Sequence, residues 1–242
     1  MEPQKTFLDL RTSCNDVDGA PGGDASGERR EFLLACSATL LAAVASSPLS
    51  ANTAPQIKRY QASILSDEQG RPMRAAELKP LTNYLFHYPF VATPCLLIDM
   101  GRDVGGVGKR KSIVAFSAIC SHKLAYPARE VAFIRFQASA SKHSEAERIH
   151  CCADHSVYDP SANAKVVAGP APAPLAAIAL SYDAKTDQIR ALGTAGTEQF
   201  DAFFAKYDFK LSMEYGGKAR QQSAAATRVQ ELSLYCRNVA QC

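Results

Sequence analysis

Two short cysteine–histidine pairs are the residues of this chain best suited to chemistry. Cys120 and His122 form a Cys-x-His pair, and Cys152 and His155 form a Cys-x-x-His pair. Two thiolates and two imidazoles can bind a [2Fe–2S] cluster, with both cysteines on one iron and both histidines on the other. The same four side chains suit tetrahedral Zn²⁺, which would make the site structural. Cys151 is an alternative to Cys152, although only Cys152 keeps the Cys-x-x-His spacing.

The other histidines and cysteines show no comparable spacing. The remaining histidines have no partner nearby in the sequence (His87, His143 and His150). Cys95 lies in an apolar run and is predicted to be a buried thiol. Cys236 and Cys242 are close enough in sequence to form a disulfide outside the cytoplasm, but their spacing does not require one.

Strands and loops are the elements that must position the two pairs. Between residues 57 and 195, short strands and turn signals alternate, which is typical of a mainly β domain. The strands are predicted at 60–65, 90–100, 112–119, 131–137, 164–167, 178–182 and 189–192, and 138–148 is expected to be a surface loop. Each pair follows an apolar stretch, so we expect both on loops at one end of a β-sheet.

A change of period marks a C-terminal extension over residues 196–242. Aromatic and aliphatic residues recur there at helical spacing (Phe200, Phe203, Phe204, Tyr207 and Leu211), which predicts an amphipathic helix that Gly216 and Gly217 end. A second helix is predicted at 224–239. The aromatic face of the first helix is expected to pack on the β domain, with docking to a partner subunit as the alternative.

The N-terminal part has the features of a targeting signal. Residues 1–28 are rich in Gly, Asp and Ser and are predicted to be disordered. Residues 29–54 begin with Arg29-Arg30 and continue into a modest apolar run, which resembles a twin-arginine export signal. Cleavage of the segment and its retention as a membrane-anchor helix both stay open, and a buried core helix is the alternative. The signal predicts a location on the periplasmic side of the bacterial inner membrane.

Composition limits the function classes. The chain has 47% hydrophobic and 21% charged residues, which is typical of a globular protein with a real core. Its net charge of +3 does not indicate nucleic-acid binding.

The two pairs resemble the two cluster-binding boxes of the Rieske family. Gly169-Pro170-Ala171-Pro172 resembles the proline loop that covers the cluster in Rieske subunits of cytochrome bc-type quinol oxidases, and Tyr158-Asp159 resembles the Tyr-Asp that follows the second box there. The resemblance covers about residues 85–185. It implies a Rieske-type antiparallel β-sandwich with a cluster-binding subdomain.

The resemblance also implies roles for individual residues. Cys120 and Cys152 would bind the buried iron, and His122 and His155 would bind the outer iron. His155 would be the catalytic histidine that hydrogen-bonds a quinol and takes up its proton. Ser156 and Tyr158 would hydrogen-bond the cluster or a cysteine sulfur.

The function that the resemblance implies is one-electron transfer. The chain would be the iron–sulfur subunit of a quinol-oxidising respiratory or photosynthetic complex, with quinol and a cytochrome as redox partners and no substrate turnover of its own. An alternative is the small electron-transfer subunit of a periplasmic oxidoreductase of the arsenite-oxidase type. No histidine follows His155, which disfavours a Rieske oxygenase with a second, mononuclear iron site.

Two features depart from the family pattern. The positions of the second cysteine in each box correspond to Ala125 and Asp154, so the disulfide that usually joins the boxes is absent. The stretch from His155 to Tyr158 is one residue shorter than the usual second box.

Overall fold

The computed structural model describes residues 56–242, and the fold over this range is mainly β. The prediction of a mainly β chain is confirmed. The predicted disordered segment 1–28 and the predicted signal or anchor segment 29–54 lie outside the described residues. In the described range, no helix is both long and apolar enough to cross a membrane.

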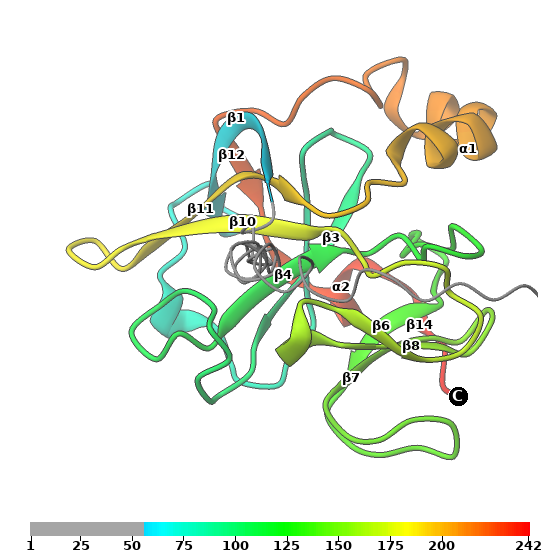
Figure 1. Cartoon of the computed structure of the whole chain (residues 1–242). Coiled ribbons are helices and arrows are strands. Elements are labelled where there is room, and N and C mark those ends of the chain that lie inside the picture. The colour runs from blue at the N-terminus through cyan, green and yellow to red at the C-terminus, as the bar shows by residue number, and fades with distance from the viewer. Residues whose placement is uncertain (1–55) are drawn as a thin grey trace, which may run out of the picture. The chain divides into compact units, whose positions relative to one another are not determined.

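A large sheet of eight strands forms one part of the fold (Figure 1). Its order is β12-β1-β11-β10-β4-β3-β2-β13. The strands are β1 (Ile57–Ser66), β2 (Tyr84–His87), β3 (Pro94–Asp99), β4 (Ile113–Ser117), β10 (Ala177–Asp183), β11 (Gln188–Ala195), β12 (Ala226–Arg228) and β13 (Gln230–Glu231). All pairs are antiparallel except β1 with β12.

The two edge strands of this sheet, β12 and β13, are neighbours in the sequence. Only Val229 separates β12 from β13, although β12 pairs with β1 and β13 pairs with β2 at the opposite end of the strand order. Val229 is 1% exposed and its N–H donates to the carbonyl of Ser66 at 2.8 Å. The short segment therefore bridges both edges, and the sheet curves toward closure as in a barrel.

The centre of the sheet follows from the hydrophobic pattern. All six residues of β3 are buried, which fits their nearly continuous apolar run. Three hydrophobic clusters form the core: one below β1 to β4, one between the two sheets, and one beneath the long helix.

A smaller sheet carries the second cysteine–histidine pair. Its order is β6-β7-β8-β9, formed by β6 (Ile134–Gln137), β7 (Arg148–Cys151), β8 (Ser156–Asp159) and β9 (Lys165–Ala168). Beside it, β5 (Val131–Ala132) pairs in parallel with β14 (Asn238–Val239). In Figure 1, β6, β7, β8 and β14 lie together, with the C-terminal end beside them. Two single 3₁₀ turns complete the β region, at Ala75–Glu77 and Pro160–Ala162.

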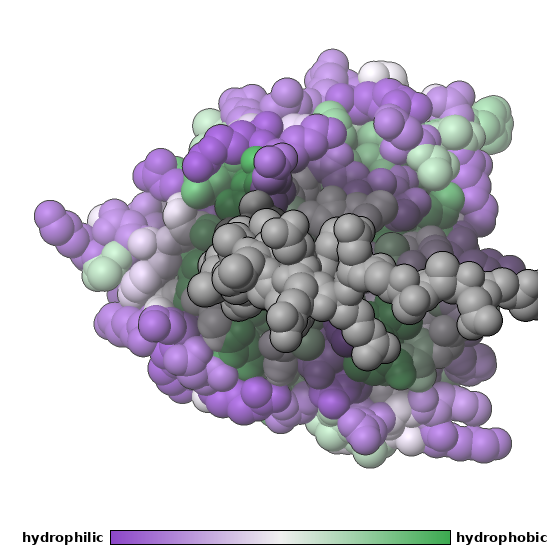
Figure 2. Space-filling view, viewed as in Figure 1, coloured by the Kyte–Doolittle hydropathy of each residue, from purple (hydrophilic) through white to green (hydrophobic). Residues whose placement is uncertain are grey.

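The predicted amphipathic helix is confirmed as α1 (Phe200–Tyr215). Its buried residues are Phe200, Phe203, Phe204 and Leu211, which belong to the predicted apolar face. The helix ends at Gly216, whose left-handed backbone (φ 56°) is a common helix stop. The rim of the molecule seen in Figure 2 is mostly hydrophilic, although Phe209 and Met213 of α1 are exposed.

The predicted second helix at 224–239 is wrong. The structure has β12, β13, a single helical turn α2 (Leu232–Tyr235) and β14 in this range. The segment fills the two open edges of the large sheet, and its β-branched residues Thr227 and Val229 fit that extended backbone. Pairing with distant strands therefore outweighs the local helical pattern.

Candidate metal centre

The first box lies in a tight loop after β4. The Cys120 N–H donates to the Ala125 carbonyl, and the Leu124 N–H donates to the Cys120 carbonyl, both at 2.9 Å. On the outside of the loop, the Tyr126 ring packs edge-on against Phe203 of α1, with 4.9 Å between centroids. The helix therefore supports the backbone that holds Cys120.

The second box is the turn of the β7–β8 hairpin. The His155 N–H donates to the Cys151 carbonyl at 2.8 Å, and His155 has a left-handed backbone with φ 59°. The two strands were not predicted, because each has only four residues and includes buried polar side chains. His150 and Ser156 are both 0% exposed.

Two free thiols meet between the boxes. Cys120 and Cys151 are both 0% exposed, and their sulfurs and an Asp154 carboxylate oxygen all lie within 4.8 Å of one another. A hydrogen bond from the Cys151 thiol is the main reason why the pKa of Cys120 falls to about 7, with burial opposing it and the Tyr158 hydroxyl helping. The same contact raises the pKa of Cys151. The pair therefore favours one thiolate in the absence of metal.

Asp154 and His122 complete this group. The Asp154 side chain is 3% exposed, and its Oδ2 lies 2.9 Å from His122 Nδ1 and 3.3 Å from Cys120 Sγ. Its Oδ1 accepts from the Ser156 N–H at 3.0 Å. Burial raises the pKa of Asp154, but hydrogen bonds from the Ser156 N–H and from both thiols outweigh burial and lower it. The His122 side chain is 35% exposed, so one side of the group reaches solvent.

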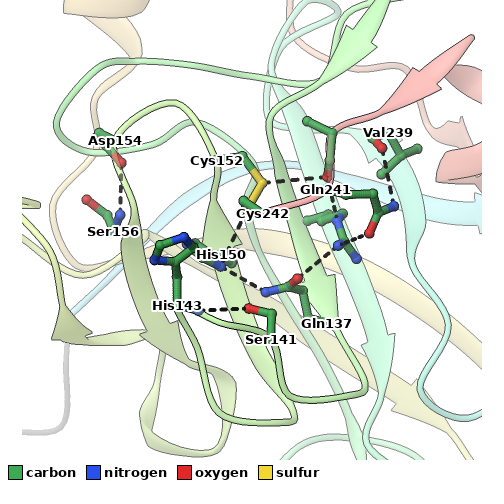
Figure 3. The surroundings of a disulfide bond; sticks show 12 residues. Gln137, Ser141, His143, His150, Cys152, Asp154, Ser156, Val239, Gln241 and Cys242 are labelled. Atoms are coloured by element: carbon green, nitrogen blue, oxygen red, sulfur yellow. Dashed lines mark hydrogen bonds between the residues drawn. A yellow bond between two sulfur atoms is a disulfide. The ribbon is translucent and has the colours of Figure 1, made fainter.

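Cys152 does not join these residues. It forms a disulfide with Cys242, with 5.6 Å between the Cα atoms (Figure 3). Its N–H donates to the Phe133 carbonyl at 2.6 Å, which turns the residue toward β5 and the C-terminal segment. The pairing of Cys236 with Cys242, which the sequence leaves open, is therefore not formed, and Cys236 is a buried free thiol. Cys95 is a buried free thiol, as predicted.

His155 lies in a second group. Its ring centroid is 4.4 Å from that of His143 and 5.6 Å from that of His150. Donor atoms of His150, His155 and Cys242 lie within 4.8 Å of one another. Figure 3 shows His150 between the disulfide and Gln137, with Asp154 apart from them beside Ser156.

The structure therefore brings together a different set from the two predicted pairs. Of the four predicted ligands, Cys120 and His122 lie at the buried thiol group, while Cys152 and His155 face the other way. Cys151 and Asp154 take part instead. Their Cys-x-x-Asp spacing is present in the sequence, but the sequence prediction has histidine as the partner of the second cysteine.

Three further features fit an iron–sulfur cluster bound at the Cys120 and Cys151 thiols. The Tyr158 hydroxyl lies 3.4 Å from Cys120 Sγ and accepts from the Ser121 N–H at 3.3 Å. The Ser156 hydroxyl is buried without a partner among the described residues, and such a donor suits an acceptor such as a bridging sulfide. At Gly169 (φ 83°) a Cβ would lie 2.5 Å from the His155 carbonyl oxygen, so the predicted proline loop lies against the second box. The residues present thus fit an iron–sulfur cluster.

The chain is similar to a solved Rieske domain. This is the soluble domain of the Rieske protein II (soxF) from Sulfolobus acidocaldarius. The sequence identity is 26%, the match covers 56% of this chain and 78% of that chain, and the TM-score is 0.42. No family model matches the sequence. The function is therefore inferred from the site itself.

Proposed function

We propose that this chain transfers single electrons through a Rieske-type [2Fe–2S] cluster. The observation that carries this proposal is the meeting of two fully buried free thiols, Cys120 from the first-box loop and Cys151 from the end of β7, with His122 at their solvent side. Buried thiols that only fill space in a core need no imidazole or carboxylate beside them. The presence of both at Cys120 and Cys151 therefore favours metal binding. The first box also keeps its Cys-x-His spacing.

Each residue has a task in this proposal. The Cys120 and Cys151 thiolates would hold one iron of the cluster, and His122 would be a ligand of the other. When bound, the cluster supplies a one-electron redox couple, which for histidine-ligated centres lies at roughly −150 to +300 mV. Tyr158 hydrogen-bonds the Cys120 sulfur, and Ser121 ties the proline loop to the first box by donating to the Ala173 carbonyl at 2.6 Å.

The proposed setting is a quinol-oxidising respiratory or photosynthetic complex at the periplasmic side of the bacterial inner membrane. The chain would be its iron–sulfur subunit, exported by the twin-arginine segment, with quinol and a cytochrome as partners. The partly exposed His122 supports direct contact with a redox partner. The alternative is the electron-transfer subunit of a periplasmic, arsenite-oxidase-type oxidoreductase, which differs in its partner and not in its cluster.

Metal and sulfide analysis of the purified chain, with EPR of the reduced form, tests the cluster. We expect two irons and two acid-labile sulfides per chain and a rhombic [2Fe–2S] signal. Cys120→Ser and Cys151→Ser should each abolish the signal, while Cys95→Ser, a matched change at a buried free thiol elsewhere, should keep it. Zinc in place of iron, or a Cys120–Cys151 disulfide without metal, would refute the proposal.

A redox titration separates the two settings. A high potential that falls at alkaline pH is expected for a quinol-oxidising subunit. A low potential that does not change with pH would favour the periplasmic oxidoreductase.

A further inference from the structure

We infer that Asp154, and not His155, is the second protein ligand of the outer iron. The cluster would then be held by two thiolates, one imidazole and one carboxylate (Cys120, Cys151, His122 and Asp154). This inference rests on the proposed function and specifies the ligands of the same site.

The contacts of Asp154 are with the other ligands of the site. Its Oδ2 lies 2.9 Å from His122 Nδ1 and 3.3 Å from Cys120 Sγ. The sulfurs of Cys120 and Cys151 and a carboxylate oxygen of Asp154 lie within 4.8 Å of one another. Its Oδ1 accepts from the Ser156 N–H, which fixes the direction of the carboxylate. Carboxylates bind iron in proteins together with histidine. The side chain is therefore positioned to bind the same metal as His122.

The buried carboxylate of Asp154 accepts hydrogen bonds but has little positive charge beside it. Its side chain is only 3% exposed, and an unpaired buried carboxylate is costly. Among the salt bridges of residues 56–242, its only partner is His122, which is charged only when protonated. An iron ion supplies the missing positive charge directly.

The geometry of His155 argues against it as the ligand. Its donor atom groups with His150 and Cys242, whose disulfide partner Cys152 has turned away from Cys120. His155 is part of the turn that places Asp154 at the thiols, and its backbone there is left-handed (φ 59°). For His155 to replace Asp154, this hairpin turn would have to be rebuilt.

The carboxylate has a chemical consequence. A neutral imidazole leaves the cluster less negative than an anionic ligand does, and a less negative cluster is easier to reduce. An aspartate ligand therefore lowers the reduction potential relative to a cluster with two histidines. It also leaves one histidine nitrogen bound to iron instead of two.

The number of bound histidine nitrogens is the decisive measurement. We would label the chain with ¹⁵N-histidine, reduce the cluster, and record pulsed EPR (ESEEM and ENDOR). One strongly coupled histidine nitrogen is expected in the wild-type protein. Asp154→His should keep the cluster, show two such nitrogens, and shift the potential upward.

Two variants complete the test. His155→Asn is the matched control, because asparagine also tolerates the left-handed backbone, and it should leave iron content and nitrogen coupling unchanged. Asp154→Ala should lose most of the iron, and Asp154→His keeps the test valid if the alanine variant fails to fold.

The outcomes separate this inference from the proposed function. Two coupled nitrogens in the wild type, with one lost in His155→Asn, would overturn the aspartate ligand and leave the electron-transfer function intact. A wild-type chain without any [2Fe–2S] signal would overturn both.

Discussion

At the scale of single residues, Tyr158 connects the two boxes through one hydroxyl. It lies on β8 of the second box, yet its oxygen contacts Cys120 Sγ and the Ser121 N–H of the first box. It is 0% exposed, so water cannot replace these hydrogen bonds. A donor at a cysteine sulfur withdraws charge from the cluster and makes its reduction easier.

Removal of this hydroxyl should lower the reduction potential. A hydrogen bond of about 1 kcal/mol corresponds to roughly 40 mV in a one-electron couple, so Tyr158→Phe should shift the potential downward by about that amount. A redox titration followed by EPR measures the shift. Tyr84→Phe, a matched change on β2 away from the thiols, should leave the potential unchanged, and an equal shift there would contradict the role of Tyr158.

Sequence alone predicts part of the site and misses part for a physical reason. Cys120 and His122 lie together at the buried thiol group, because a Cys-x-His loop after a strand depends only on local spacing. The choice between Cys151 and Cys152 depends on which side of a hairpin each side chain faces, and neighbouring residues of a strand face opposite ways. Counted from Asp154 instead of His155, the stretch to Tyr158 is one residue longer and is no longer short of the usual second box.

At the scale of elements, α1 supports the loop of the first box. Phe203 is 0% exposed and packs against Tyr126, which lies beyond Cys120 in that loop. Lys206 of the same helix donates to the Lys123 carbonyl at 2.6 Å. The helix is therefore part of the framework of the site.

Truncation of Phe203 should destabilise both the fold and the site. Phe203→Ala should lower the free energy of unfolding by about 3–5 kcal/mol and reduce iron content. Phe209→Ala on the same helix is the control, since this ring is 81% exposed and its loss should cost little. Urea unfolding and iron analysis of both variants measure the difference, and equal effects would contradict the supporting role.

The disulfide is the second stabilising element. It joins residues 90 apart in sequence and fixes the C-terminal segment next to β5 and β6. Cys242→Ser should lower the free energy of unfolding by about 2–4 kcal/mol. The wild type in reductant should match the variant in urea unfolding, and a variant as stable as the oxidised wild type would show that the bond contributes nothing.

The strands, like the site, are predicted from the sequence only where the local pattern is strong. β3 and β4 are predicted because their apolar runs are long and continuous. β7, β8 and β12 to β14 are not, because each has at most four residues, and β12 to β14 pair with strands that are distant in sequence. Such pairings carry no local signal.

At the scale of the whole molecule, a histidine outside the site sets a limit on acid stability. Burial, with help from nearby Arg129, lowers the pKa of His87 from 6.5 to about 4. Between these values the unfolded chain binds a proton that the folded chain does not. Stability should therefore be complete above about pH 6.5 and fall as the pH decreases toward 4.

Replacement of His87 tests this dependence. His87 is partly exposed, so we expect it to contribute about 2 kcal/mol to the loss between pH 6.5 and 4. His87→Asn should flatten the stability profile over that range by this amount. Urea unfolding at several pH values measures both profiles, and parallel profiles would assign the acid sensitivity to another group.

Cys151 and Cys152 are adjacent in the chain but end in opposite oxidation states, one as a free thiol and the other in a disulfide. With the proposed cluster, maturation would have to treat the two neighbours differently. Cys151 and Cys120 would have to stay reduced until iron binds, while Cys152 is oxidised with Cys242. An oxidant that acts too early could join Cys151 to Cys120 and close the site to metal, so the timing of the two steps decides how much active protein the cell obtains.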